Sequence, residues 1–165
     1  MADTSYLARV IYRQRTTQTG REIDFSDTAP FHLMLRAKSI PSPSNAPNTV
    51  ESTTLEDDTQ TFEMGIKTTD SKEFTGNLEK EDFDRLLAVG SKRCDIIQLY
   101  GTDGVGGTAK SCYIGQITPT VNDVGGVDEI LEMTATVVQN TAPKWVTDDI
   151  TVVDNGDGTF AVTKV

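Results

Sequence analysis

The chain has 165 residues and a formal net charge of −10, from 25 acidic and 15 basic side chains. That length is enough for one domain around a single core, and that charge excludes a protein that clamps nucleic acid through a wholly basic surface. No stretch approaches the roughly 20 apolar residues of a membrane span, and the N-terminus lacks the apolar core of a secretory signal. We therefore expect a soluble protein kept in a reducing compartment.

β-Branched residues dominate the composition. Threonine occurs 24 times, valine 14 times and isoleucine 10 times, which together make 48 of the 165 residues. Their side chains are stiff at χ1 and fit a pleated surface better than a helix. The composition therefore predicts a mainly β fold.

Few residues suit catalysis or metal binding. His32 is the single histidine, and Cys94 and Cys112 are too few and too far apart for a disulfide framework or a zinc site. We expect both cysteines to be small buried or half-buried residues, and His32 to lie at the surface or at the edge of the core. The sequence thus predicts no enzyme, no cofactor and no bound transition metal.

Candidate strands follow one another at short intervals along the chain. In the segment around Phe62 and Met64, both side chains fall on one face, together with Ile66. In the longest candidate, Val127 and Leu131 begin an apolar face that alternates with polar residues. Period-2 alternation predicts strands at residues 6–13, 31–38, 61–67, 94–100, 110–118, 127–138, 150–153 and 159–164.

Two glycine-rich segments resemble ligand loops but lack the necessary spacing. A phosphate-binding loop needs glycine directly before its lysine and a helix after it, whereas Ala109 precedes Lys110 and a strand follows. An EF-hand loop needs oxygen ligands at its third and fifth positions, which are Gly156 and Gly158 when counted from Asp154. Both segments are interpreted as hairpin loops, with Cys94 expected opposite position 116 and Cys112 opposite position 98.

One segment, 78–89, has the pattern of a helix. Asn77 is a candidate N-cap, acidic residues fill the first turns, and Gly90 stands where a C-terminal glycine belongs. Apolar side chains at i, i+3 and i+4 form one stripe that must pack on a sheet; they are Phe83, Leu86 and Leu87.

Residues 39–60 change character and predict a long projecting loop. The first part is rich in proline and serine, and the second is rich in threonine and then acidic. Folded back as a hairpin, half of this segment spans up to ~33 Å at ~3.3 Å per residue. A loop of this length without a core pattern is functional or disordered, so we expect it either to be disordered or to contact another molecule.

This segment and the residues after it follow one pattern: a valine- and threonine-rich strand, a Thr-Leu-acidic-Asp step, an aromatic residue and a Gly-Ile/Leu-Lys turn. The residues of the pattern are Pro47, Asn48, Thr49, Val50, Thr53, Thr54, Leu55, Glu56, Asp57 and Asp58, followed by Phe62 and by Gly65, Ile66 and Lys67. The pattern resembles that of the major tail tube proteins of long, non-contractile-tailed phages. The later order, a strand at 72–76, one helix at 78–89 and then strands through Val138, also agrees with that family.

The resemblance implies a β-sandwich that forms a barrel with other copies, one flanking helix and a long inter-ring loop, all within a tail tube domain at 1–142. Residues 143–165 fall outside it and are expected to form an additional C-terminal hairpin. Members of this family assemble as hexameric rings that stack into a hollow tube, and the long loop reaches an adjacent ring. Val50 and Leu55 are the apolar residues expected to anchor that contact.

The resemblance also implies partners and a location. The partners would be further copies of the chain, a tape measure protein, a tail-tip initiator, a tail terminator and genome DNA that passes through without specific binding, in a virion tail that involves no membrane. An acidic lumen suits this role because it repels phosphate, whereas lysine and arginine would hold DNA by counterion release. The same features fit a phage or a headless tail-like bacteriocin.

The main alternative is a β-sandwich binding or adhesion module, for example one that binds carbohydrate. Such a module, if secreted, would have an export signal or surface aromatic residues, and the chain has one tryptophan, Trp145. An enzyme is a third and weaker hypothesis, because acidic runs such as 56–58 are typical of a solvated surface.

Overall fold

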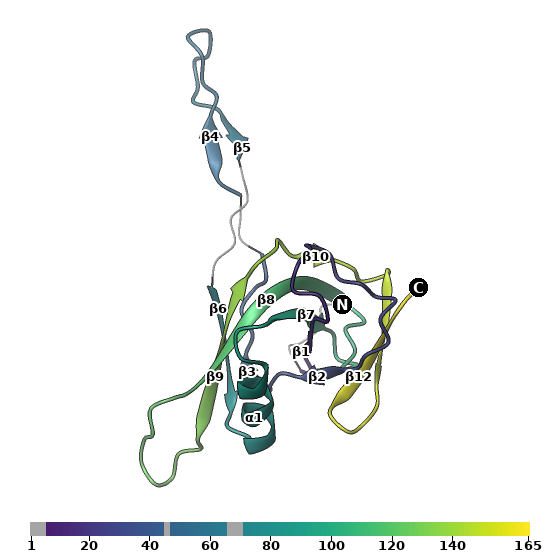
Figure 1. The fold of residues 1–165 in the computed structure, drawn as a ribbon. Helices are drawn as coiled ribbons and strands as arrows, with labels where there is room; N and C mark the ends of the chain where they lie inside the picture. Colours follow the sequence, from purple (N-terminus) through teal and green to yellow (C-terminus); the bar gives the residue numbers. More distant parts are fainter. Residues whose placement is uncertain (1–5, 45–46, 66–70) are drawn as a thin grey trace.

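A computed structural model describes residues 6–44, 47–65 and 71–165. It consists of one strongly curled β-sheet, a single short helix beside it, and a long arm that projects from the body (Figure 1). The prediction of a mainly β fold with one flanking helix and a projecting loop is confirmed. The body strands form one continuous sheet rather than the two separate sheets of a simple sandwich.

The predicted strands and helix occur in the expected order with changed boundaries, the predicted strand 31–38 is divided into two, and two short strands, 49–51 and 144–145, are additional to those that alternation predicted. They are β1 (Arg9–Gln14), β2 (Phe31–Leu33), β3 (Arg36–Ser39), β4 (Thr49–Glu51), β5 (Phe62–Met64), β6 (Ser71–Asn77), α1 (Lys80–Val89), β7 (Arg93–Tyr100), β8 (Ala109–Val121), β9 (Glu132–Gln139), β10 (Lys144–Trp145), β11 (Ile150–Asp154) and β12 (Thr159–Lys164).

All strand pairs that the structure describes are antiparallel. In the main sheet the strand order is β11-β12-β2-β1-β7-β8-β9-β6-β3, with β10 added beside β8, while β4 and β5 form a separate two-stranded sheet in the arm. The C-terminal hairpin of β11 and β12 joins the main sheet because Phe160 pairs with Phe31 of β2. Among the described strands, β11 and β3 are the two ends of the strand order.

The central strands are buried on both faces, and each face carries its own core. On one face Tyr12, Ile96 and Phe74 pack with Leu86 and Val89 of α1. The other core is covered by the C-terminal hairpin and by the segment around Phe25; its buried residues include Ile11, Phe31, Ile97, Leu99, Ile150, Val152, Phe160 and Val162. Residues 150–162 therefore belong to the packing of the sheet.

A buried charge cluster fastens the long connection between β1 and β2. The carboxylate of Asp95, on the central strand β7, accepts hydrogen bonds from Arg13 Nη2 and Arg15 Nη1, each at 2.8 Å. The guanidinium of Arg13 also donates to the carbonyl oxygens of Asp24, Asp27 and Ala29. Arg15 likewise donates to carbonyl oxygens of this connection. The Asp95 carboxylate orients both arginines, and through them the connection between β1 and β2 is held against the sheet although it contains no strand.

The helix begins later than the sequence predicted. Asn77 is not its N-cap, because it is the last residue of β6 and pairs with Glu132 of β9. Glu79 takes the cap position without a side-chain hydrogen bond. Leu87 points outward and is exposed, whereas Val89 is buried beside Leu86. The helix ends at Gly90 as predicted, with a positive φ of 62° that favours glycine.

The predicted strand 31–38 is interrupted. Met34 and Leu35 are consecutive and both buried, which breaks the alternation. The amide of Met34 donates to the carbonyl oxygen of Val10 on β1, and two residues later Arg36 pairs with Asn77 on β6. The chain thus changes partner strands at this point, and a change of partner cannot be read from local alternation.

The predicted strand 127–138 begins too early. Strand β9 starts at Glu132, and Val127 lies in a loop with its side chain fully exposed. The reason is the partner strand: β8 ends at Val121, which pairs with Met133, so residues 122–131 have no strand beside them. These ten residues form a loop that projects from the end of the body opposite the arm (Figure 1).

The two glycine-rich segments are hairpin loops, as predicted. Gly156 and Gly158 both have positive φ in the loop between β11 and β12. In the loop between β7 and β8 the carboxylate of Asp103 accepts the amides of Val105 and Gly107, and these hydrogen bonds lower its pKa. The register differs by one residue from the expected positions, about 116 and about 98, since Cys94 pairs with Gly115 and Cys112 with Ile97.

The helix that the structure describes is short. Within residues 6–44, 47–65 and 71–165, no helix is long and apolar enough to cross a membrane.

Candidate interaction site

The arm, residues 47–65, is a β-hairpin that contains all ten residues predicted for the inter-ring loop. Pro47 and Asn48 precede β4, Thr49 and Val50 lie in it, and residues 53–58 form the tip. Strands β4 and β5 pair with Thr49 opposite Met64, Val50 opposite Glu63 and Glu51 opposite Phe62. The structure therefore brings the predicted residues together in one element, and adds β5 to it.

Threonine hydroxyls extend the hairpin beyond its two short strands. The amide of Ser52 donates to the carbonyl oxygen of Thr61 at 3.0 Å, and the amide of Thr61 donates to Thr53 Oγ1 at 2.8 Å. At the tip, the carboxylate of Asp57 accepts the amide of Thr54 at 2.8 Å. Side-chain oxygens of this kind replace ladder hydrogen bonds where the chain turns.

Glycine is required at position 65, where the two strands of the arm approach each other at its base. The amide of Gly65 donates to the carbonyl oxygen of Asn48. A Cβ atom at position 65 would lie 2.8 Å from that oxygen and 3.1 Å from a methyl group of Val50. The Gly-Ile-Lys turn of the resemblance begins at this close approach; Ile66 and Lys67 lie outside the described residues.

The sequence predicted Phe62 and Met64 in a strand that follows the long loop, and the structure places this strand, β5, on the arm. They point to the same face of the hairpin and are exposed by 56% and 75%, while Val50 on the other face is exposed by 56%. Leu55 at the tip is fully exposed. Period-2 alternation found the strand correctly, but it could not show that neither face is covered.

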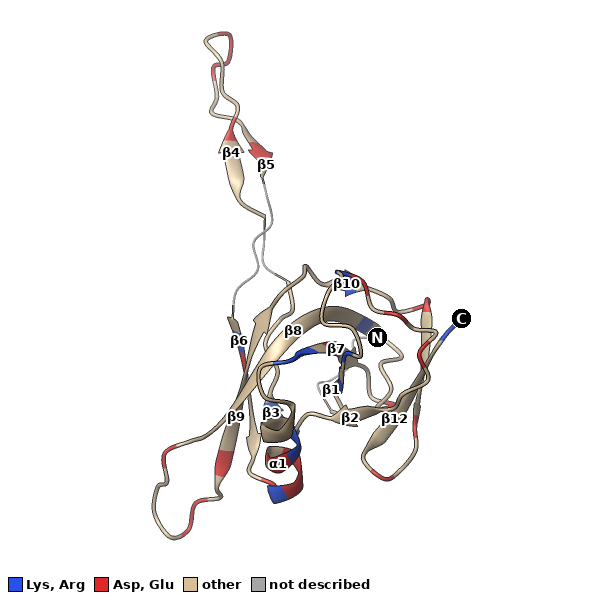
Figure 2. Cartoon of the chain, in the orientation of Figure 1, with Lys and Arg blue, Asp and Glu red and all other residues tan. Residues whose placement is uncertain are grey.

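The described arm is uniformly acidic. Figure 2 shows acidic residues along the hairpin and at its tip, and no basic residues in its described part. The five carboxylates are those of Glu51, Glu56, Asp57, Asp58 and Glu63, and residues 47–65 contain no lysine or arginine. This charge opposes contact with another acidic surface at low ionic strength.

Two glutamines of the body hold the root of the arm, residues 41–44. The side-chain amide of Gln98 donates to the carbonyl oxygen of Pro41 at 2.9 Å, and that of Gln139 donates to the carbonyl oxygen of Pro43 at 2.9 Å. Gln98 is oriented by the hydroxyl of Tyr113, which donates to its Oε1 at 2.9 Å. Burial raises the pKa of Tyr113, so this hydroxyl stays a neutral donor. No sequence pattern marks these glutamines, because only the tertiary structure brings them to the prolines.

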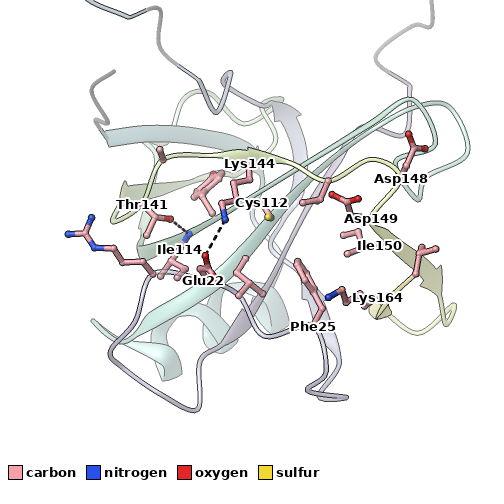
Figure 3. Close-up of a pocket in the computed structure, with 16 residues that line it drawn as sticks. Glu22, Phe25, Cys112, Ile114, Thr141, Lys144, Asp148, Asp149, Ile150 and Lys164 are labelled. Atoms are coloured by element: carbon pink, nitrogen blue, oxygen red, sulfur yellow. Dashed lines mark hydrogen bonds and ion pairs between the residues drawn. The ribbon is translucent and has the colours of Figure 1, made fainter. Parts of the chain in front are cut away.

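A cleft of about 480 Å³ lies between the segment 21–25, strand β8 and the C-terminal residues (Figure 3). Its floor includes Ile114 and Ile150, and its rim has charges of both signs, with Lys144 Nζ 3.5 Å from a carboxylate oxygen of Glu22. Burial raises the pKa of the Cys112 thiol, which lines the cleft, to about 11. This thiol is therefore protonated at neutral pH and a poor nucleophile.

The cysteines and the histidine lie where the sequence predicted. Cys94 and Cys112 are free and buried, and His32 is half-buried at the edge of the core. Among the described residues, no group of three or more histidine, cysteine or carboxylate side chains is placed to hold a metal ion.

Comparison with known proteins does not assign the chain to a family. No protein-family model matches the chain, and no curated protein is significantly similar to it.

Proposed function

We propose that this chain is the structural subunit of a phage-type tail tube, which assembles as hexameric rings that stack into a hollow conduit for DNA or into the channel of a tail-like bacteriocin. The resemblance of residues 47–67 to tail tube proteins suggests this role. The observation that carries it is the arm, a hairpin that extends away from its own body with apolar side chains on both faces.

An isolated two-stranded hairpin is at best marginally stable in water. The hydrogen bonds of residues 47–65 in the described part of the chain lie within the arm, and its apolar side chains Phe62 and Met64 are exposed. A segment of this kind gains stability when a partner covers it. In a stacked tube that partner is the adjacent ring, and each subunit presents the same arm.

The two ends of the sheet support ring formation. Strands β11 and β3 each have a free side within the described part of the chain, and exposed edges of this kind favour pairing with another chain. Because the two edges differ, pairing between copies would be head-to-tail, and a head-to-tail contact closes into a ring when the rotation allows it. An acidic subunit would then form a lumen from which DNA is repelled.

Negative-stain electron microscopy of the purified full chain at rising concentration, alone and with tail-tip partners, tests this function. Rings and tubes are expected. Replacing residues 47–65 with a short linker should preserve the β circular-dichroism spectrum and the melting temperature within a few degrees, because each doubling of loop length changes closure by only about 0.6 kcal/mol. The same replacement should stop elongation into tubes.

A protein that stays monomeric under all these conditions would contradict the proposal, and so would an armless variant that still forms normal tubes. A binding or adhesion module is the second candidate, because the cleft of Figure 3 has an apolar floor and a charged rim. That function predicts a monomer that binds a glycan or peptide in the cleft and needs no arm.

A further inference from the structure

A second exposed apolar element lies at the far end of the molecule from the arm. In the loop 122–131, which joins β8 to β9, Val124, Val127 and Ile130 are exposed by 72%, 102% and 67%. Three large apolar side chains exposed to this extent within seven residues of one projection are the kind of surface that another protein can cover. Scattered single residues would need no such explanation.

Backbone hydrogen bonds tie this loop to the body and brace it internally. The amide of Asn122 donates to the carbonyl oxygen of Glu132 at 3.0 Å, and the amide of Glu129 donates to that of Gly126 at 3.1 Å. The carbonyl oxygen of Leu131 accepts the amide of Leu78 at 2.9 Å, just before α1. These hydrogen bonds order the loop before a partner binds. Binding therefore costs less conformational entropy than it would for a flexible loop.

The loop and the arm leave opposite ends of the same pair of strands. Strands β6 and β9 pair antiparallel, with Ser71 opposite Val138 and Asn77 opposite Glu132. The arm precedes Ser71 in the chain and therefore lies at one end of this strand pair. The loop precedes Glu132 and lies at the opposite end of the pair. Figure 1 shows the two projections pointing in opposite directions.

We propose that the loop 122–131 is the receiving surface for the arm of a second copy of this chain in the adjacent ring, with Val124, Val127 and Ile130 against Phe62 and Met64. This inference rests on the proposed function. Because the arm and the loop project in opposite directions, displacing one copy along β6 and β9 would turn its loop toward the arm of the next copy. Each copy has one arm and one loop, so the contact repeats head-to-tail without limit, as a stacked tube requires.

Cross-linking tests the contact directly in the full chain. One protein carries Val127→Cys and a second carries Phe62→Cys, and the two are mixed with a short bismaleimide linker. The native thiols of Cys94 and Cys112 are buried and do not compete. A linked dimer of the two variants is expected. A control pair, Leu87→Cys with Phe62→Cys, uses an exposed position on α1 and should not cross-link.

Elongation provides the second measurement. Val127→Ser combined with Ile130→Ser should form rings with an unchanged circular-dichroism spectrum, yet need a roughly tenfold or higher protein concentration for tube growth, because two apolar side chains lose their burial. Leu87→Gln is the matched control and should elongate like the wild type.

Three outcomes are informative. Specific cross-linking together with impaired elongation supports the inference. Normal tubes from the double variant without cross-linking overturn it, while leaving the proposed function intact if the armless variant still fails to elongate. A wild-type protein that forms neither rings nor tubes, even with tail partners, overturns both.

Discussion

The side-chain amide of Gln139, the last residue of β9, donates a hydrogen bond of 2.9 Å to the carbonyl oxygen of Pro43 in the root of the arm. Both residues are buried. Proline has no amide hydrogen of its own, so the carbonyl of Pro43 is the backbone group through which this residue can form a hydrogen bond. The root of the arm is thus held by a side chain that lies 96 residues further along the chain.

Replacing Gln139 by leucine should disturb the root of the arm. The carbonyl of Pro43 would be left buried without a donor, which costs about 1–3 kcal/mol. We expect a lower free energy of unfolding in urea and weaker tube elongation. Gln116→Leu is the control, because the Gln116 amide donates to the Ser91 carbonyl at an exposed site away from the arm. Equal effects of the two variants on elongation would show that Gln139 does not position the arm.

Replacing Asp95 by asparagine should be among the most destabilising single changes. Arg13 and Arg15 would keep their charges in a buried site without the carboxylate, and breaking such a buried pair costs about 3–5 kcal/mol. Urea denaturation measures the loss. Asp154→Asn, which breaks the partly exposed pair with Arg9 at 2.9 Å, should cost at most about 1 kcal/mol. Similar losses for both variants would contradict this interpretation of Asp95.

Stability should fall as the pH drops below neutral, in part because of His32. Burial lowers the pKa of His32 below its ordinary value of 6.5, with a smaller contribution from Arg85, and Asp157 opposes the shift. The unfolded chain then binds the proton more readily, so the free energy of unfolding decreases as the pH falls through 6.5. His32→Gln should flatten this slope when unfolding is followed from pH 7.5 to 5.5. An unchanged slope would show that other groups cause it.

Added salt should promote tube growth. The described arm carries five carboxylates and no basic residue, and the loop 122–131 carries three carboxylates, Asp123, Asp128 and Glu129. Their repulsion is screened once the Debye length falls from about 30 Å at 0.01 M salt to about 8 Å at 0.15 M, whereas apolar burial persists. Light scattering at increasing sodium chloride tests this. Salt-induced dissolution of tubes would instead indicate that the arm binds a basic surface.

Some features of this protein are determined locally and could be read from the sequence. The excess of β-branched residues predicted the mainly β fold, the positive-φ glycines Gly156 and Gly90 marked a turn and a helix end, and the proline-rich start of 39–60 predicted the projecting loop. Each of these depends on the conformational preferences of a residue and its near neighbours, and those preferences act in the unfolded chain as well.

Other features depend on which strand lies next to which, and only the tertiary structure decided them. Val127 is in a loop because β8 ends opposite Met133, and Asn77 is in a strand because β9 extends to meet it. Phe62 and Met64 alternate like core residues, yet they are exposed because their hairpin leaves the body. No sequence pattern marks Gln98 and Gln139. They hold the root of the arm through hydrogen bonds to two prolines that lie beside them only in the folded protein. Burial and pairing are properties of contacts between distant segments, and local alternation records only which side chains share a face.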